Sequence, residues 1–363
     1  MPQTNDVHVV DIQALTSPAV IRAELPLGAD TSELVSNARQ SIRNIVTGRD
    51  DRLLVVVGPC SIHDVNLARD YAEKLVRMRN QFAEELEIVM RVYFEKPRTS
   101  VGWKGLINDP HLDGSYDIHL GLRLARQLLI DVAQLGVPAA TEMLDPIIPQ
   151  YIADAVAWTA IGARTTESQT HRQMASGLSM PVGFKNGTDG SVQVAINAIL
   201  AAQESHRFMG VNDEGMASIV VTTGNPETHL VLRGGKQGPN YDARHVSEAS
   251  LALVRHHLSP RLMIDCSHDN AGKDHLRQPV VLDAIGLQVA AGEGHIMGVM
   301  IESHLISGKQ SIPADLKQLV YGQSITDACV DISMTEKMLT ELSSNVGSRR
   351  RHNRAHPSIA SGM

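Results

Sequence analysis

The sequence predicts an α/β protein built as a (β/α)8 TIM barrel, with an N-terminal extension and an inserted β-hairpin. Three observations predict this fold: a length of 363 residues, eight short apolar runs separated by helical patterns, and polar residues at the end of every run. A barrel of this kind needs about 250 residues, so the chain has room for extensions. A six-stranded open sheet is the alternative, but the phosphate-binding fingerprint of a dinucleotide fold is absent.

The composition excludes several classes of function. A net charge of −7 argues against a nucleic-acid binder, which usually carries a basic field. Apolar runs stay well short of the roughly 20 residues that a membrane span requires, and the first residues lack the pattern of a signal peptide. The cysteines Cys60, Cys266 and Cys329 are too few and odd in number for a disulfide framework. We therefore expect a cytoplasmic protein with reduced thiols, bound to neither nucleic acid nor membrane.

The N-terminal extension covers residues 1–50 in our interpretation. A helix start signal stands at Asp30-Thr31-Ser32, and an apolar stripe at helical spacing follows and ends at Gly48. Because nothing catalytic is visible there, we expect the segment to pack on the barrel or on a neighbouring subunit.

The catalytic barrel is expected over residues 51–346. The predicted strands are Leu53–Val57, Ile88–Phe94, Val137–Met143, Ala160–Ala163, Val182–Phe184, Leu230–Leu232, Leu262–Asp265 and Ile296–Ile301. Strands that alternate with helices indicate a parallel sheet. A hairpin signal at 206–222 interrupts this pattern between the fifth and sixth strands. Residues 347–363 are basic, polar and without periodicity, so we expect a disordered tail.

Cationic residues gather at the carboxyl ends of the predicted strands, where barrel enzymes carry their chemistry. They are Arg91, Lys96, Arg164, Lys185 and Arg233. Charged side chains rarely stay buried without a partner, and arginine matches carboxylate and phosphate oxygens in pairs. These cations at one mouth of an acidic protein therefore predict a small, highly charged anion. Arg98-Thr99 is a candidate site for a second phosphate.

A second set combines a thiol, an imidazole and carboxylates: Cys60, His268, Glu302 and Asp327. This mixture suits a divalent transition metal and does not decide between Mn, Fe, Co and Zn. The residues match no spacing motif, so on the residues alone a buried structural cysteine among satisfied polar groups is the slightly better interpretation.

Several motifs resemble class I 3-deoxy-D-arabino-heptulosonate-7-phosphate (DAHP) synthases of the microbial, feedback-regulated type. They are Gly58-Pro59-Cys60-Ser61-Ile62-His63, Lys96-Pro97-Arg98-Thr99, Gly102-Trp103-Lys104-Gly105-Leu106, the segments 161–168 and 181–190, Leu232-Arg233-Gly234-Gly235-Lys236 and Asp265-Cys266-Ser267-His268. The resemblance implies a transferase that condenses phosphoenolpyruvate with erythrose 4-phosphate to DAHP and phosphate. This reaction is the first step of the shikimate pathway to aromatic amino acids.

The resemblance also assigns roles to residues. It implies that phosphoenolpyruvate is held by Arg91, Lys96, Arg164, Lys185 and Arg233, with Glu142, Gly162 and Ala163 nearby. Lys96-Pro97-Arg98-Thr99 would meet the erythrose phosphate, and Lys96 is the candidate proton donor to its aldehyde oxygen. Cys60, His268, Glu302 and Asp327 would bind the metal and act in catalysis; Asp327 enters mainly through the family.

Members of the family are usually inhibited by one aromatic amino acid, so the resemblance implies an effector pocket and a homodimer or homotetramer. The expected pocket residues are Pro149, Gln150, Leu178, Ser179, Phe208, Gly210 and Val220, with Asp6 supplied by an adjacent subunit. Short motifs such as Asp145-Pro146 and Phe208-Met209-Gly210 resemble the tyrosine-responsive isoenzymes, which favours tyrosine as the effector.

Three alternatives stay open at this point. The first is a synthase that joins phosphoenolpyruvate to arabinose 5-phosphate, and the second is a Schiff-base aldolase that uses Lys185. The third is a catalytically dead barrel that senses aromatic amino acids, but the complete cationic and metal sets argue against it.

Overall fold

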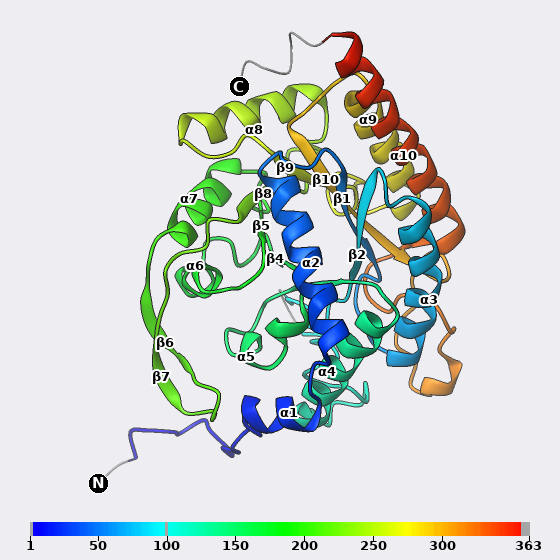
Figure 1. The fold of residues 1–363 in the computed structure, drawn as a ribbon. Coiled ribbons are helices and arrows are strands. Elements are labelled where there is room, and N and C mark those ends of the chain that lie inside the picture. The colour runs from blue at the N-terminus through cyan, green and yellow to red at the C-terminus, as the bar shows by residue number, and fades with distance from the viewer. Residues whose placement is uncertain (1–2, 99–100, 357–363) are drawn as a thin grey trace.

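The computed structural model describes residues 3–98 and 101–356, and within these ranges eight parallel strands close into a barrel (Figure 1). Strand β1 pairs with β2 on one side and with β10 on the other, so the sheet has no free edge. In barrel order the strands are β1 (Leu53–Gly58), β2 (Leu86–Arg91), β3 (Ala139–Glu142), β4 (Trp158–Ile161), β5 (Val182–Lys185), β8 (Thr228–Leu232), β9 (Leu262–Asp265) and β10 (Ile296–His304). The predicted TIM barrel is confirmed, and the open sheet is wrong.

Helices follow the strands and surround the barrel (Figure 1). They are α3 (Val65–Gln81), α4 (Ile118–Gln134), α5 (Pro149–Ile152), α6 (Gln169–Ser176), α7 (Val192–Gln203), α8 (Ala243–Arg255) and α9 (Gln278–Ala290). Capping side chains fix where several of them begin: Asp64, Asp117 and Asp242 each accept a backbone N–H of the first turn. Among the described residues, no helix is long and apolar enough to cross a membrane.

The N-terminal extension contains two helices, α1 (Pro18–Glu24) and α2 (Ala29–Val46), of which only α2 was predicted. Figure 1 shows α2 lying across the barrel. The apolar stripe of α2, which includes Ile42 and Ile45, forms one buried cluster with interior side chains from the starts of strands, such as Leu54 and Trp158. The helix therefore closes the amino end of the barrel.

The predicted hairpin is present as the antiparallel strands β6 (Arg207–Val211) and β7 (Ala217–Val221), which stand beside the barrel (Figure 1). Alternation along the strands gives the hairpin two faces. Phe208 and Val220 belong to one face and line a cavity against the barrel. Met209 and Ile219 belong to the other and are 92% and 77% exposed.

The prediction of a disordered tail is wrong for residues 347–355. A short strand, β11 (Val330–Asp331), leads into helix α10, which runs from Ile332 to Ala355. The arginines of its last turns are bound instead of solvated: Arg349 is buried and donates to the backbone carbonyl of Asp51, and Arg350 forms a 2.7 Å ion pair with the carboxylate of Asp51. Residues 357–363 lie outside the described residues.

Candidate active site

A cavity of about 660 Å³ opens at the carboxyl ends of the barrel strands. Its walls carry residues from both predicted sets: Arg164, Arg233, His268, Glu302 and Asp327. The loops that follow β4, β8 and β9 supply the cationic and imidazole groups, whereas Glu302 lies within β10 itself. Residues that were predicted at the carboxyl ends of the strands therefore line one shared cavity.

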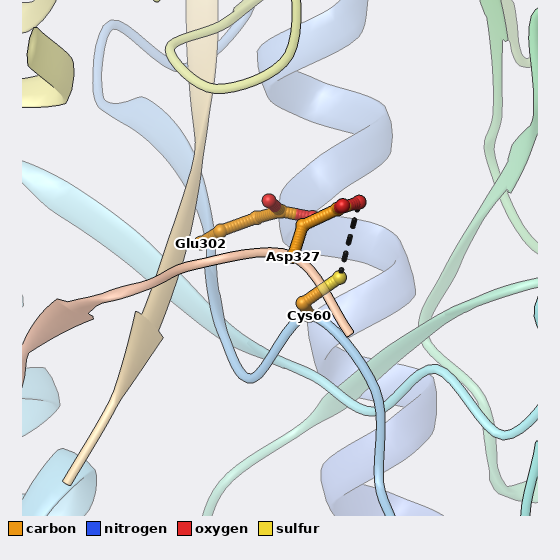
Figure 2. A group of neighbouring side chains, drawn as sticks. All are labelled: Cys60, Glu302 and Asp327. Carbon is orange, nitrogen blue, oxygen red and sulfur yellow. Dashed lines mark hydrogen bonds between the residues drawn. The ribbon is translucent and has the colours of Figure 1, made fainter. Parts of the chain in front are cut away.

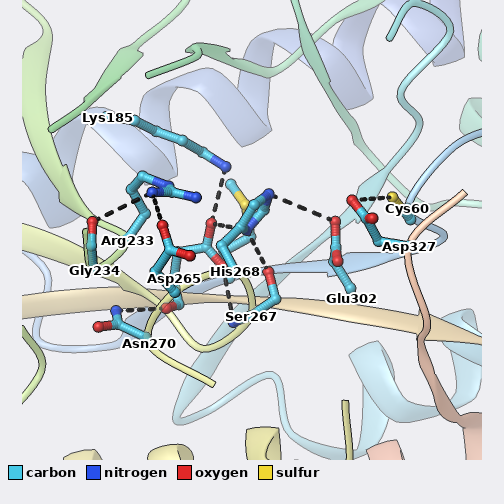
Figure 3. A network of polar contacts seen from close by, with 12 residues as sticks. Cys60, Lys185, Arg233, Gly234, Asp265, Ser267, His268, Asn270, Glu302 and Asp327 are labelled. Carbon is cyan, nitrogen blue, oxygen red and sulfur yellow. Dashed lines mark hydrogen bonds and ion pairs between the residues drawn. The ribbon is translucent and has the colours of Figure 1, made fainter. Parts of the chain in front are cut away.

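Three of the predicted metal ligands come together at this cavity, where Glu302 and Asp327 line the wall and Cys60 is buried behind them. One ligand atom each from Cys60, Glu302 and Asp327 lies within 4.8 Å of the others, and Figure 2 shows the side chains pointing toward one another. His268 stands just beside them, with its Nε2 atom 4.0 Å from Glu302 Oε1 (Figure 3). A thiol, two carboxylates and an adjacent imidazole are donors that fit a divalent transition metal.

Lys96 lies against this donor group. Its Nζ atom is 3.1 Å from Cys60 Sγ and 3.2 Å from the Cys60 carbonyl oxygen. Burial opposes the charge of Lys96, but Cys60 and the carboxylates of Glu302 and Asp327 raise its pKa above the ordinary value. Burial and Glu302 raise the pKa of the Cys60 thiol, and the positive charge of Lys96 partly offsets this rise. The ammonium form of Lys96 is therefore favoured beside a potential thiolate.

The Asp327 carboxyl is the most exposed of the three clustered candidate metal ligands, Cys60, Glu302 and Asp327. Burial opposes its ionisation, but Lys96, His268 and Lys309 together lower its pKa below the ordinary value. The carboxylate form, which a metal requires, is favoured by this surrounding positive charge.

Arg91 is fixed below the donor group. Its guanidinium is fully buried, donates to Glu302 Oε1 at 2.9 Å and to the carbonyls of Pro59 and Cys60, and lies 3.4 Å above the Tyr93 ring. The remaining terminal nitrogen contacts only the thioether sulfur of Met300, a weak acceptor. Arg91 thus joins the cationic set to the metal-ligating set.

The other cations differ in how firmly they are held. Lys185 is buried and donates to Asp265 at 2.9 Å (Figure 3), and Arg233 forms an ion pair with Asp269. By contrast, Arg164 is exposed, and among the described residues its one hydrogen bond is a long contact of 3.4 Å with the carbonyl of Pro97. An exposed guanidinium at the rim is free to meet an incoming anion.

The segment expected to meet the sugar phosphate is only partly described. Arg98 is exposed, and its Nε atom donates to the Trp103 carbonyl at 2.8 Å. Thr99 lies outside the described residues. Pro97 is half-buried beside Lys96, and its carbonyl oxygen lies 3.4 Å from a terminal nitrogen of Arg164, which lines the cavity.

Gly162 gives the Glu142 carboxylate its room. A Cβ atom at Gly162 would stand 2.1 Å from Glu142 Oε1, a distance that no side chain tolerates. Glu142 is the last residue of β3 and is buried. A methyl group at Gly162 would therefore force the buried Glu142 carboxylate to move, and Gly162 and Ala163 begin the loop that follows β4.

Two buried carboxyl groups were missed as site residues although both lie in the quoted motifs or beside them. Asp265 ends β9 and contacts both Lys185 and His268. Glu95 precedes Lys96 and accepts backbone N–H groups of Leu144 and Asp145; burial and then Asp145 raise its pKa to about 8. Asp265 ends β9, and Glu95 directly follows the predicted strand Ile88–Phe94, although β2 ends earlier, at Arg91; position after a predicted strand was the available signal.

A second cavity, of about 540 Å³, lies between the hairpin and the barrel. It brings together the expected effector residues Pro149, Gln150, Leu178, Ser179, Phe208, Gly210 and Val220. Asp6 is not among its lining residues and stands on an exposed N-terminal segment of the same chain.

Comparison with known proteins places the chain in a family. Residues 25–340 match the model of the DAHP synthetase I family. The Tyr-sensitive phospho-2-dehydro-3-deoxyheptonate aldolase of Escherichia coli strain K12 is 51% identical over 338 residues, which cover 93% of this chain and 95% of the relative. The Phe-sensitive enzyme of the same organism is also 51% identical, over 96% of this chain and 99% of its own.

A solved structure agrees with these matches. The phospho-2-dehydro-3-deoxyheptonate aldolase of Francisella tularensis SCHU S4 superposes with a TM-score of 0.92 at 49% identity, covering 94% of this chain and 99% of that chain. Fold, motifs and length all correspond, and the chain belongs to the DAHP synthetase I family.

Proposed function

We propose that this enzyme condenses phosphoenolpyruvate with D-erythrose 4-phosphate and water to give DAHP and phosphate. The observation that carries the proposal is the contact between its two predicted sets: Lys96 Nζ lies 3.1 Å from Cys60 Sγ, and Arg91 is bonded to Glu302. An anion site and a metal-ligating group therefore share one cavity, as a reaction between a phosphorylated enol and a phosphorylated aldehyde requires.

Cys60, His268, Glu302 and Asp327 would hold one divalent metal. Their donor atoms fit the metal by chemistry and by proximity, since Cys60, Glu302 and Asp327 cluster within 4.8 Å. Such an ion would supply Lewis acidity to the aldehyde oxygen of the sugar. Metal reconstitution would show which of Mn, Fe, Co and Zn supports activity.

The chain's own residues would orient the reactants. Arg164, Lys185 and Arg233, with Arg91 below, offset the repulsion between two phosphorylated substrates and hold them for attack. The enol carbon C3 of phosphoenolpyruvate bonds to the aldehyde carbon, water adds at C2, and phosphate leaves. Lys96, held in its ammonium form by neighbouring anionic groups, would donate a proton to the aldehyde oxygen as that bond forms.

Two enzyme alternatives predict different results. A Schiff-base lysine needs a free lone pair, whereas the Lys185 amine is engaged by the buried Asp265 carboxylate. A synthase for arabinose 5-phosphate would prefer a five-carbon aldose phosphate.

The decisive experiment is a DAHP-forming assay on metal-stripped protein with Mn, Fe, Co and Zn returned one at a time. We expect activity only after metal return, and turnover with the four-carbon and not the five-carbon aldose phosphate. Full activity without metal, or a borohydride-trapped adduct on Lys185, would refute the proposal.

We further propose that the second cavity binds an aromatic amino acid and that tyrosine is the preferred effector. The apolar side chains of Leu178, Phe208 and Val220 would surround the ring, and Gln150 and Ser179 offer polar groups. Overall similarity does not choose the effector, because the Tyr-sensitive and Phe-sensitive relatives are equally identical to this chain. The local motifs favour tyrosine, and inhibition assays with tyrosine, phenylalanine and tryptophan test it.

A homodimer or homotetramer would complete this cavity with Asp6 of the partner subunit. The N-terminal segment supports the proposal because its apolar residues Val10 and Ile12 are 100% and 78% exposed on a single chain. Light scattering should show an oligomer, and removal of residues 1–15 should weaken both assembly and tyrosine inhibition.

A further inference from the structure

The Asp265 carboxylate connects the two halves of the candidate active site. It lies at the end of β9 and is completely buried. One oxygen, Oδ2, accepts from Lys185 Nζ at 2.9 Å and from His268 Nδ1 at 2.8 Å. The other, Oδ1, accepts the backbone N–H of Ser267 at 3.0 Å and its hydroxyl at 2.6 Å. Figure 3 shows this carboxylate between Lys185 and His268.

These contacts set the orientation of the His268 ring. Because the Ser267 hydroxyl donates to Asp265, its oxygen is left to accept from His268 Nδ1, 2.6 Å away. Both neighbours of Nδ1 are then acceptors, so the proton resides on Nδ1 and the lone pair on Nε2. Nε2 is the atom that faces Glu302. A carboxylate behind a histidine commonly fixes the ring in this way for a metal.

The same oxygen holds Lys185 on the side of the anion. One of the three ammonium donors of Lys185 is taken by Asp265, which aims the side chain and leaves the other donors for a ligand. Burial would oppose ionisation of Asp265, but His268 and Lys185 lower its pKa well below the ordinary value, so the negative charge is retained between them.

We propose that Asp265 is a positioning residue that couples phosphoenolpyruvate binding at Lys185 to metal binding at His268. The inference rests on the proposed function, since it takes Lys185 as part of the phosphoenolpyruvate site and His268 as a metal ligand. Asp265 is completely buried and is not among the residues that line the cavity, so it would act through Lys185 and His268. A merely structural carboxylate would affect stability without changing the two affinities together.

The test compares three variants that should give three different patterns. Asp265→Asn removes the negative charge that Lys185 and His268 share. Ser267→Ala removes the hydroxyl group that contacts both His268 and Asp265. Asp269→Asn removes the charged partner of Arg233. Cobalt affinity is measured by competition with a chelator, with the thiolate absorption of cobalt at Cys60 as the reporter. Phosphoenolpyruvate affinity is measured by calorimetry on metal-free protein.

We expect Asp265→Asn to weaken cobalt binding by about 10–100-fold and also to weaken phosphoenolpyruvate binding by at least about fivefold. Ser267→Ala should weaken cobalt binding alone, and Asp269→Asn should weaken phosphoenolpyruvate binding alone. Loss of only one affinity in Asp265→Asn, or tighter phosphoenolpyruvate binding, overturns the coupling.

Two controls distinguish failure of this proposal from misfolding of a variant and from failure of the proposed function. If Asp265→Asn does not fold by circular dichroism, Ser267→Ala decides: unchanged cobalt affinity in that variant also overturns the proposal. If the wild-type protein binds neither cobalt nor phosphoenolpyruvate, the proposed function fails instead, whatever the variants do.

Discussion

The Lys96 ammonium group and the Cys60 thiol lie 3.1 Å apart, and both side chains are buried. Burial and the Glu302 carboxylate raise the pKa of the Cys60 thiol, and Lys96 partly offsets this rise. Burial lowers the pKa of Lys96, but Cys60 and the carboxylates of Glu302 and Asp327 raise it above its ordinary value. We therefore expect Lys96 to serve as an acid without taking part in metal ligation itself.

The variant Lys96→Met separates these roles. We expect kcat for DAHP formation to fall by about 10²–10⁴-fold, because a positioned general acid contributes that much. Cobalt binding should persist, since Cys60, Glu302 and Asp327 are unchanged. Steady-state kinetics and cobalt absorption measure the two effects. Lys74→Met, at an exposed position on α3, is the matched control, and an equal loss there would contradict a specific role.

The close approach of Gly162 to Glu142 gives a second prediction. In Gly162→Ala, the new methyl group would meet Glu142 Oε1 at 2.1 Å, so the buried carboxylate has to move. We expect KM for phosphoenolpyruvate to rise by about tenfold or more, because small displacements in a positioned site are costly. Gly294→Ala is the control, since a Cβ there meets nothing within 4 Å. If the two variants had the same KM for phosphoenolpyruvate, Glu142 would have no role in binding it.

Most of the fold could be predicted because barrel strands are buried on both faces and stand out as apolar runs. The carboxyl ends of the predicted strands then indicated Arg91, Lys185 and Glu302 as candidate site residues with no knowledge of contacts. Asp265 was missed because its role depends on Lys185, 80 residues earlier in the chain. A carboxylate at a strand end looks the same in sequence whether it binds a ligand or orients another residue.

Tertiary contacts also explain the error at the C-terminus. Local composition around Arg349 and Arg350 is polar and basic, which is typical of disorder. The partner that orders them, Asp51, lies about 300 residues away at the start of the barrel. Charge pairing across that separation leaves no periodic signal in the sequence.

Glu95 predicts a pH dependence of stability. Burial and Asp145 raise the pKa of Glu95 from 4.5 to about 8, so the native protein binds a proton there that the unfolded chain has already lost. The stabilising contribution is complete at low pH and is lost as pH rises through about 8, by at most about 1.4 kcal/mol per pH unit.

The variant Glu95→Gln should remove this slope because the amide cannot ionise but can still accept the backbone N–H of Asp145. Unfolding curves at several pH values between about 5 and 8 measure it against wild type. Glu84→Gln, at an exposed position, should retain the wild-type slope. A wild-type slope in Glu95→Gln would show that Glu95 is ionised across this range.

The second cavity, which we propose binds the effector, can be narrowed by a substitution in the hairpin. A Cβ atom at Gly210 would already stand 2.8 Å from Val220 Cγ2, so Gly210→Val must displace the cavity wall or occupy the cavity. We expect the tyrosine concentration for half inhibition to rise by about tenfold, with kcat unchanged because the active site is separate. Glu214→Ala, in the exposed hairpin turn, is the control. Unaltered inhibition in Gly210→Val would place the effector elsewhere.

The ordered end of α10 predicts a cost for shortening the chain. Truncation after Val346 removes Arg349, which is 4% exposed and bonded to the Asp51 backbone, and Arg350, whose ion pair is more accessible. Exposed ion pairs contribute little, so the buried arginine should dominate a loss of about 1–3 kcal/mol in the free energy of unfolding. Truncation after His356 keeps every contact that the structure describes and should match wild type. If the chain truncated after Val346 were as stable as wild type, the prediction would be wrong. The bonds from Arg349 and Arg350 to Asp51 would then contribute nothing to the free energy of unfolding.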